Sequence, residues 1–169
     1  MKKIKSCCFT GHRPQNLPFG FNEDDDRCKR LKALLRKHIV DLIDNKGVTR
    51  FISGMALGVD VYAAQIVLKE KANHPDIILE CVLPCETQSN HWRVDQQEVY
   101  YKILEYCDKV TLLQHAYTAD CMNKRNRYIV DNSDYIIAVW NGKPSGTGNT
   151  VHYALQQGKK IITINPYDL

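Results

Sequence analysis

Three short segments combine glycines with small polar or charged side chains, as phosphate-binding loops do. They are residues 10–14 (Thr-Gly-His-Arg-Pro), 53–60 (Ser-Gly-Met-Ala-Leu-Gly-Val-Asp) and 143–150 (Lys-Pro-Ser-Gly-Thr-Gly-Asn-Thr). Glycine lets a backbone turn or approach a ligand closely, and free N–H groups at the start of a helix bind anions. The three segments therefore predict contacts to a phosphate or a similar anion.

In the first segment, Gly11 allows close backbone approach to a ligand. Arg13 precedes Pro14, which favours an extended backbone at Arg13. An extended arginine at the end of a strand is well placed to hold a phosphate or carboxylate by two hydrogen bonds. His12 is a further candidate contact, although a loop histidine also serves structural roles. The segment lacks the Gly-x-Gly-x-x-Gly turn of dinucleotide dehydrogenases.

The second segment is predicted to join a strand to a helix. Its candidate ligand contacts are Ser53, Gly54, Met55, Gly58 and Asp60. Asp60 falls in the first helical turn, where a carboxylate either complements the helix dipole or touches a ligand. Both roles are open from the sequence.

The third segment also precedes a helix. Its candidate contacts are Ser145, Gly146, Thr147, Gly148 and Asn149. Backbone N–H groups in such a loop are open to phosphate. The alternative is a plain turn in which a serine, threonine or asparagine caps the helix.

Two isolated side chains complete the candidate site. Trp92 is placed either to stack on a base or to pack in the core. Arg125, together with Arg127, either brings positive charge to the cleft or forms surface ion pairs. No catalytic residue is assigned.

The cysteines do not indicate a metal site. Seven are present, and no pair has the Cys-x-x-Cys spacing that is common among zinc ligands. Cys81 and Cys85, with His91 nearby, are the best candidate ligands, but their spacing is poor. We expect most cysteines to be small buried hydrophobic residues, and we expect no metal.

Hydrophobic patterning predicts alternating strands and helices. Strands are expected over residues 4–9, 48–53, 77–83, 109–113, 134–140 and 160–164, and helices over 24–45, 58–72, 92–106, 119–131 and 147–157. This alternation predicts an α/β fold of the Rossmann-like, doubly wound kind, with a largely parallel sheet and helices on both faces. Ligands of such folds bind at the carboxyl ends of the strands, where the three segments lie.

Composition fits one soluble globular domain over residues 1–169. Hydrophobic residues make up 44% and charged residues 25% of the chain. The net charge of +4 is spread along the sequence, so charge alone does not favour nucleic acid. Apolar runs are far shorter than the roughly 20 residues of a membrane helix. The basic N-terminus has no apolar stretch after it, so we expect a cytoplasmic protein that does not bind membranes.

Taken in order, these motifs resemble those of the YpsA-like proteins of the SLOG superfamily. The resemblance rests on residues 9–14, 53–60, 125–131 and 145–151, together with Gln88 and Trp92. The superfamily includes the DNA-processing protein DprA and the cytokinin-activating LOG enzymes. Membership implies a Rossmann-like fold and a site for nucleotides or nucleotide-derived ligands. It implies no settled reaction for the YpsA-like branch.

The resemblance to LOG phosphoribohydrolases is incomplete. Pro144, Gly146 and Gly148 match the Pro-Gly-Gly-x-Gly-Thr-x-x-Glu motif of those enzymes, but His152 stands where the motif has its catalytic glutamate. An imidazole does not supply the negative charge that stabilises an oxocarbenium-like state. Hydrolysis stays open as an alternative because Asp60 or Glu86 offers a carboxylate.

We therefore expect a protein that binds a nucleotide or a derivative, such as NAD, ADP-ribose or a nucleoside phosphate, as a sensor or regulator. These molecules are candidate ligands, and no cofactor is assigned. The alternatives are N-glycosidic hydrolysis of a nucleoside monophosphate and DprA-like binding of single-stranded DNA. The basic segment 119–131 is compatible with DNA, but no ladder of alternating aromatic and basic residues is evident. Self-association as a homodimer is a further expectation.

Overall fold

The computed structural model describes residues 3–169, so Met1 and Lys2 of the basic N-terminus lie outside the described residues. Within this range, six parallel strands form one sheet in the order β4-β3-β2-β1-β5-β6. The strands are β1 (Lys5–Gly11), β2 (Val48–Ser53), β3 (Ile78–Leu83), β4 (Lys109–Leu112), β5 (Tyr135–Val139) and β6 (Lys160–Ile164). The helices are α1 (Asp26–Lys46), α2 (Val59–Glu70), α3 (Val94–Tyr106), α4 (Cys121–Asp131) and α5 (Gly146–Gln156), and a short 3-10 helix spans Pro14–Asn16.

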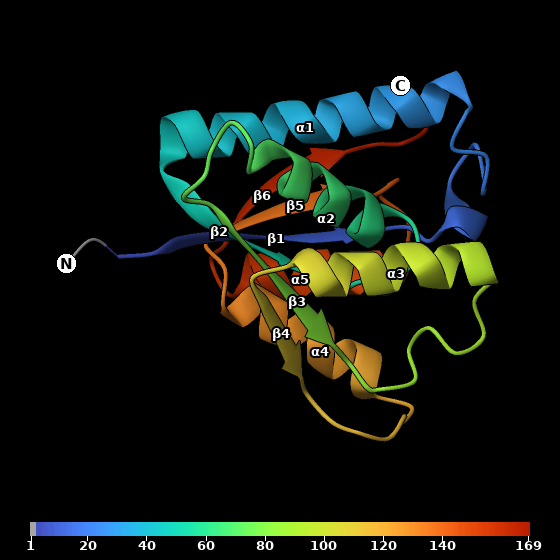
Figure 1. Cartoon of the computed structure of the whole chain (residues 1–169). Helices are drawn as coiled ribbons and strands as arrows, with labels where there is room; N and C mark the ends of the chain where they lie inside the picture. The colour runs from blue at the N-terminus through green and yellow to red at the C-terminus, as the bar shows by residue number, and fades with distance from the viewer. Residues whose placement is uncertain (1–2) are drawn as a thin grey trace.

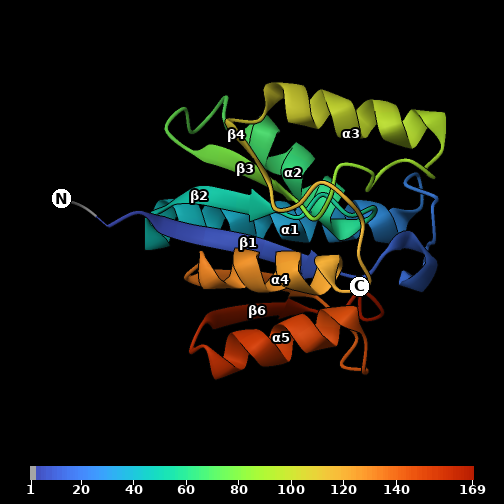
Figure 2. The ribbon, with the colours of Figure 1, turned by 90° about the horizontal axis from the view of Figure 1, so that it is seen from below.

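The sheet is covered on both faces, which confirms the predicted Rossmann-like α/β fold. Helices α1, α2 and α3 lie on one face (Figure 1), and α4 and α5 lie on the other (Figure 2). Strand β1 pairs with β2 on one side and with β5 on the other. The chain therefore winds outward in both directions from β1, and the loops that follow β1 and β5 diverge at this switch point.

The larger core lies between the sheet and helices α1–α3. Helix α1 contributes a stripe of leucines and isoleucines with helical periodicity, and the rings of Phe9 and Phe51 stack beneath it with centroids 6.1 Å apart. The α1 helix begins where the Asp25 carboxylate accepts a hydrogen bond from the Arg27 backbone N–H at 2.8 Å. It ends at Gly47, whose left-handed backbone (φ 69°) favours glycine.

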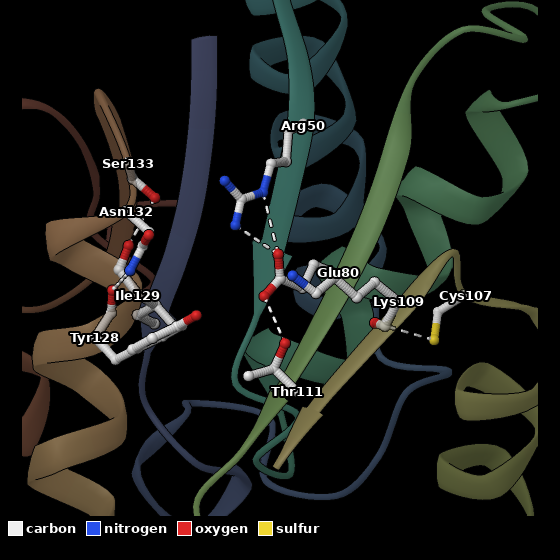
Figure 3. Close-up of polar contacts among 9 residues, drawn as sticks. All are labelled: Arg50, Glu80, Cys107, Lys109, Thr111, Tyr128, Ile129, Asn132 and Ser133. Atoms are coloured by element: carbon white, nitrogen blue, oxygen red, sulfur yellow. Dashed lines mark hydrogen bonds and ion pairs between the residues drawn. The ribbon is translucent and has the colours of Figure 1, made fainter. Parts of the chain in front are cut away.

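The opposite face of the sheet carries a buried ion pair (Figure 3). The Glu80 side chain on β3 is only 1% exposed and accepts hydrogen bonds from Arg50 on β2 at 2.5 Å and from the Thr111 hydroxyl on β4 at 2.8 Å. Three neighbouring strands are thus joined by one carboxylate. Figure 3 also shows the end of α4, where the Ser133 hydroxyl donates to the carbonyl oxygen of Ile129 at 2.7 Å.

The predicted helices and strands all form, and their ends differ from expectation by two residues or fewer. Helix α3 begins at Val94 rather than residue 92 because the side chain of Gln96 accepts from the Arg93 backbone N–H at 3.0 Å, which fixes Arg93 as the cap. No helix among residues 3–169 combines the length and apolar character needed to cross a membrane.

Candidate functional site

A cleft of about 210 Å³ opens at the switch point, between the ends of β1, β2 and β5 and the start of α4. Its lining combines the backbone of two loops with polar and charged side chains: Thr10, Gly11, His12, Arg13, Asn16, Ala56, Asp60, Met122, Arg125, Asn126, Ser145, Gly146 and Thr147, with Phe9 at its base. Residues from all three predicted loops therefore meet in one place.

The loop after β1 contributes two basic side chains to the cleft, the buried His12 and the exposed Arg13. His12 is buried, and its Nε2 accepts a hydrogen bond from the Asn141 backbone N–H at 3.2 Å. Burial lowers the pKa of His12, so the imidazole is neutral near pH 7 and ties the β1 loop to the β5 loop. Arg13 is exposed at the cleft, and within residues 3–169 its guanidinium has no hydrogen-bond or ion-pair partner.

The loop after β2 is held by its own side chains. The buried Ser53 hydroxyl donates to the carbonyl oxygen of Asp60 at 2.9 Å and accepts from the Met55 N–H at 3.1 Å. The Asp60 carboxylate accepts from the Ala56 N–H at 3.2 Å. Met55 has a left-handed backbone (φ 58°), which is rare outside glycine. Because the side chains of Ser53 and Met55 are fully buried, these residues shape the loop from behind.

Arg125, on α4, is 3% exposed and donates to neutral acceptors. Its Nη1 donates to the Gly54 carbonyl oxygen and to Oε1 of Gln88, the latter at 3.3 Å, and its Nε donates to Oδ1 of Asn126 at 2.9 Å. A Cβ atom at position 54 would lie 2.7 Å from the guanidinium. Glycine is therefore required at position 54 for Arg125 to occupy this place.

Asp60 and Arg125 are buried opposite charges that both line the cleft. Burial raises the pKa of Asp60, and the positive charge of Arg125 opposes that rise. Burial lowers the pKa of Arg125, and Asp60 opposes that fall. No direct ion pair joins the two groups in the described chain. The cleft lining thus includes one acidic and one basic buried side chain.

The N-terminus of α5 forms the wall opposite the β2 loop. The Ser145 hydroxyl accepts from the Gly148 N–H at 3.0 Å and so caps the helix. Gly146 and Thr147, the first two helical residues, line the cleft, and N–H groups at these positions have no acceptor within the helix. Gly148 is packed against Trp140, where a Cβ atom would meet the indole at 3.2 Å.

Two further hollows adjoin the cleft, and Met122 lines all three. One, of about 390 Å³, has aromatic walls formed by Phe21 and Trp92. Trp92 also packs edge-on against Tyr100 with ring centroids 5.1 Å apart, so it belongs partly to the core. The other hollow, of about 480 Å³, lies between α4 and α5 and includes Asn149.

The structure sorts the predicted residues into three groups. Eight line the cleft: Gly11, His12, Arg13, Asp60, Arg125, Ser145, Gly146 and Thr147. Trp92 and Asn149 line the adjoining hollows. Five support the loops from behind: Ser53, Gly54, Met55, Gly58 and Gly148.

Sequence reasoning missed several lining residues. Thr10 lies inside the predicted segment 10–14 without being assigned a contact, and its polar side chain at the end of β1 was an available signal. Asn16 lies two residues beyond that segment, in the short 3-10 helix. Met122 meets three hollows but carries no sequence signal, because methionine commonly fills a core.

The candidate metal ligands predicted from the sequence differ in burial. Cys81 and Cys85 are buried free thiols, whereas His91 is exposed. Over the range 3–169, no three His, Cys, Asp or Glu side chains are grouped to hold a metal ion.

Known structures share this fold. DprA from Streptococcus pneumoniae superposes with a TM-score of 0.63 at 16% identity, over 96% of this chain and 51% of that one. DprA from Helicobacter pylori, described with a single-stranded DNA binding mode, gives 0.62 at 18% identity, over 95% and 65% of the two chains. The chain therefore spans less than two thirds of either DprA chain, and the likeness shows the fold alone.

Sequence relatives are closer. The prophage-derived protein YoqJ of Bacillus subtilis is 33% identical over 151 residues, which is 81% of this chain and 88% of that protein. A UPF0398 protein of Halalkalibacterium halodurans is 28% identical over 98% of this chain and 86% of its own length. The YpsA family model, described as the YspA SLOG family, matches residues 7–169. The chain belongs to the YpsA family of SLOG proteins, as its loop motifs predicted.

Proposed function

We propose that this protein binds a phosphate-bearing nucleotide, or a nucleotide derivative, in the cleft at the switch point. One observation carries the proposal. Arg13, whose guanidinium is unpaired within residues 3–169, lines the same 210 Å³ cleft as Gly146 and Thr147, the first two residues of α5. Helix N-termini and arginine side chains both bind phosphate, the first through free N–H groups and the second through charge-assisted hydrogen bonds.

The charge distribution suggests an orientation for the ligand. We place the phosphate beside Arg13 and the N-terminus of α5 rather than beside the acidic side chain of Asp60. The sugar then lies near Asp60, whose carboxylate accepts hydroxyl hydrogen bonds. The base extends into the 390 Å³ hollow, which is lined by the rings of Phe21 and Trp92 and by Arg93, whose guanidinium lies over the Phe21 ring at 5.8 Å. Arg13 lines both spaces and so connects them.

The proposal is tested by comparing a nucleotide with its nucleoside. Isothermal titration with AMP, adenosine, ADP-ribose and NAD measures the contribution of phosphate to affinity. We expect wild-type protein to prefer AMP over adenosine by about tenfold or more, or roughly 1.4 kcal/mol, and Arg13→Ala to abolish that preference. Arg30→Ala, which removes an exposed arginine of α1, is the matched control. Retention of full AMP affinity by Arg13→Ala would overturn the assignment.

Binding of single-stranded DNA is a second candidate, favoured by the likeness to DprA chains. Exposed Arg13, Arg93 and Arg127 border the three connected hollows. A strand that neutralises several arginines releases counterions, so its affinity falls steeply with salt, whereas a single nucleotide gives a shallow slope. Titration of oligo-deoxythymidine at several salt concentrations separates the two functions.

The same samples test for hydrolysis. Asp60 is the one carboxylate on the cleft wall in the described chain, and Glu86 instead holds His115 at 2.6 Å on the exposed surface. Chromatography of AMP after incubation detects free adenine if the site is a hydrolase. Loss of that product in Asp60→Asn with AMP binding intact would assign the reaction to Asp60.

A further inference from the structure

A second, larger hollow lies among helices α1, α2 and α3, apart from the nucleotide cleft. It is a groove of about 1010 Å³ bounded by α1 and α3, with α2 as its floor. In Figure 1, α2 lies between α1 and α3. Helix α2 packs against both neighbours, so the two outer helices stand apart as walls. None of the residues that line the groove lines the nucleotide cleft.

The groove has an apolar base. Its apolar residues come from all three helices, and they are Ala33, Tyr62, Ile66, Leu68, Val99, Ile103 and Tyr106. Ile66 and Val99 are only half-buried, and Tyr106 is 63% exposed. Exposed apolar surface gathered in one groove is typical of a binding surface.

The rim of the groove is basic. Its charged residues are Lys32, Arg36, Lys69, Lys71, Lys102 and a single acid, Glu70. Three of the cations are paired, since Lys32 contacts Glu23, Arg36 contacts Glu70 and Lys71 contacts Asp108. Lys69 on α2 and Lys102 on α3 are exposed, and neither forms an ion pair within the described part of the chain. They leave uncompensated positive charge beside the apolar base.

We propose that this groove, the α1–α2–α3 groove, binds an amphipathic helix with an acidic polar face from a partner protein. The floor helix α2 has 12 residues and is about 18 Å long, which matches about three turns of a bound helix. Such a helix places apolar side chains at i, i+3, i+4 and i+7 into the groove. Its acidic residues then lie against Lys69 and Lys102.

A second copy of this chain is a poorer occupant. Pairing of the groove with itself about a two-fold axis brings the same surface together. The interface would then contain Lys69 and Lys102 of both copies, and like charges brought together oppose association. Charge complementarity therefore favours an acidic partner over self-association through this groove.

The experiment uses two synthetic helices of about 14 residues, each with a leucine stripe at the i, i+3, i+4, i+7 positions. One carries glutamate on its polar face and the other carries lysine at the same positions. Fluorescence anisotropy of the labelled peptides with the full chain should show about tenfold or tighter binding of the acidic peptide, and its affinity should fall with added salt. Equal affinities, or no binding of the acidic peptide, would overturn the proposal.

Charge reversal on the protein locates the binding. Lys69→Glu with Lys102→Glu should reverse the peptide preference, because both side chains are exposed and unpaired. Lys109→Glu with Lys143→Glu changes the net charge equally at exposed positions outside the groove and should leave the preference unchanged. Reversal by both double variants would refute the groove as the binding site.

Two outcomes would assign the groove to another occupant. A dimer of the chain that is found by light scattering and dissociated by Ile66→Glu would show that a second copy covers the groove. Displacement of the acidic peptide by oligo-deoxythymidine, with the displacement lost in the Lys69/Lys102 variant, would assign the surface to nucleic acid. Either result contradicts the proposal of an acidic helix.

Discussion

The guanidinium of Arg125, on α4, donates a hydrogen bond to the carbonyl oxygen of Gly54, the first residue after β2. The side chain of Gln88, from the loop after β3, donates to the same oxygen at 3.3 Å. One backbone carbonyl oxygen thus accepts hydrogen bonds from helix α4 and from the loop after β3. This arrangement fixes the β2 loop against α4, and with it the position of Asp60 on the cleft wall.

The contact predicts a strong energetic coupling between positions 54 and 125. Gly54→Ala places a Cβ atom 2.7 Å from the guanidinium and should reduce the free energy of unfolding by about 1–3 kcal/mol. With Arg125→Ala the space is free, so the same change should cost much less. Urea unfolding of both single variants and the double variant measures the coupling. Gly146→Ala is the control, because a Cβ atom there meets no neighbour, and simple additivity at 54 and 125 would contradict the prediction.

Asp60 should make the protein less stable as the pH rises. Burial holds the pKa of Asp60 above its ordinary value of 3.8. At pH values between 3.8, the pKa of Asp60 in the unfolded chain, and its higher pKa in the folded protein, the folded state binds more protons than the unfolded state. The free energy of unfolding therefore falls with increasing pH in this range. Asp60→Asn lacks this titration, and its stability relative to wild type should therefore rise from pH 3.8 up to the folded pKa and then level off. Urea unfolding across a pH series measures the difference.

Asp95 provides a control of opposite sign. Its hydrogen bonds with Arg93 lower the pKa of Asp95 in the folded state, so ionisation of this carboxyl favours folding. Asp95→Asn should therefore lose stability relative to wild type as the pH rises toward 3.8. A parallel response of the two asparagine variants would mean that the burial of Asp60 does not govern its titration.

Much of the fold was accessible from sequence because each element carries its own local signal. The leucine stripe of α1 and the apolar run of β5 each fix one element, and the glycine-rich loops sit between strand and helix. The Arg125 contact was not accessible in this way. Arginine on a polar helix usually lies at the surface, and its burial depends on a backbone carbonyl that is 71 residues away in the chain. The position of Ser53 likewise depends on its hydrogen bonds with the backbone of Met55 and Asp60.

Cys107 should be the most reactive of the cysteines. The neighbouring Cys81 thiol stabilises the Cys107 thiolate and lowers the pKa of Cys107 to about 7 from an ordinary value of 9.0. The thiolate is the nucleophile, so iodoacetamide should modify Cys107 near neutral pH, before the buried cysteines. Peptide mapping by mass spectrometry across a pH series measures the rates. Cys81→Ala, which removes the donor, should move the pH midpoint upward, and an unchanged midpoint would show that Cys81 does not stabilise the thiolate.

Replacing only Arg50 of the Arg50–Glu80 ion pair should destabilise the protein more than replacing both residues. The Glu80 side chain is 1% exposed, and Arg50 is its charged partner. Arg50→Met leaves an uncompensated buried carboxylate and should reduce the free energy of unfolding by about 3–5 kcal/mol, whereas Arg50→Met with Glu80→Met should recover much of that loss. Arg93→Met breaks an ion pair whose side chains are 64% and 68% exposed and should cost about 0–1 kcal/mol. Guanidinium unfolding of the four proteins measures these differences. If the double variant were less stable than Arg50→Met alone, Glu80 would be stabilising β3 through Thr111 rather than through its charge.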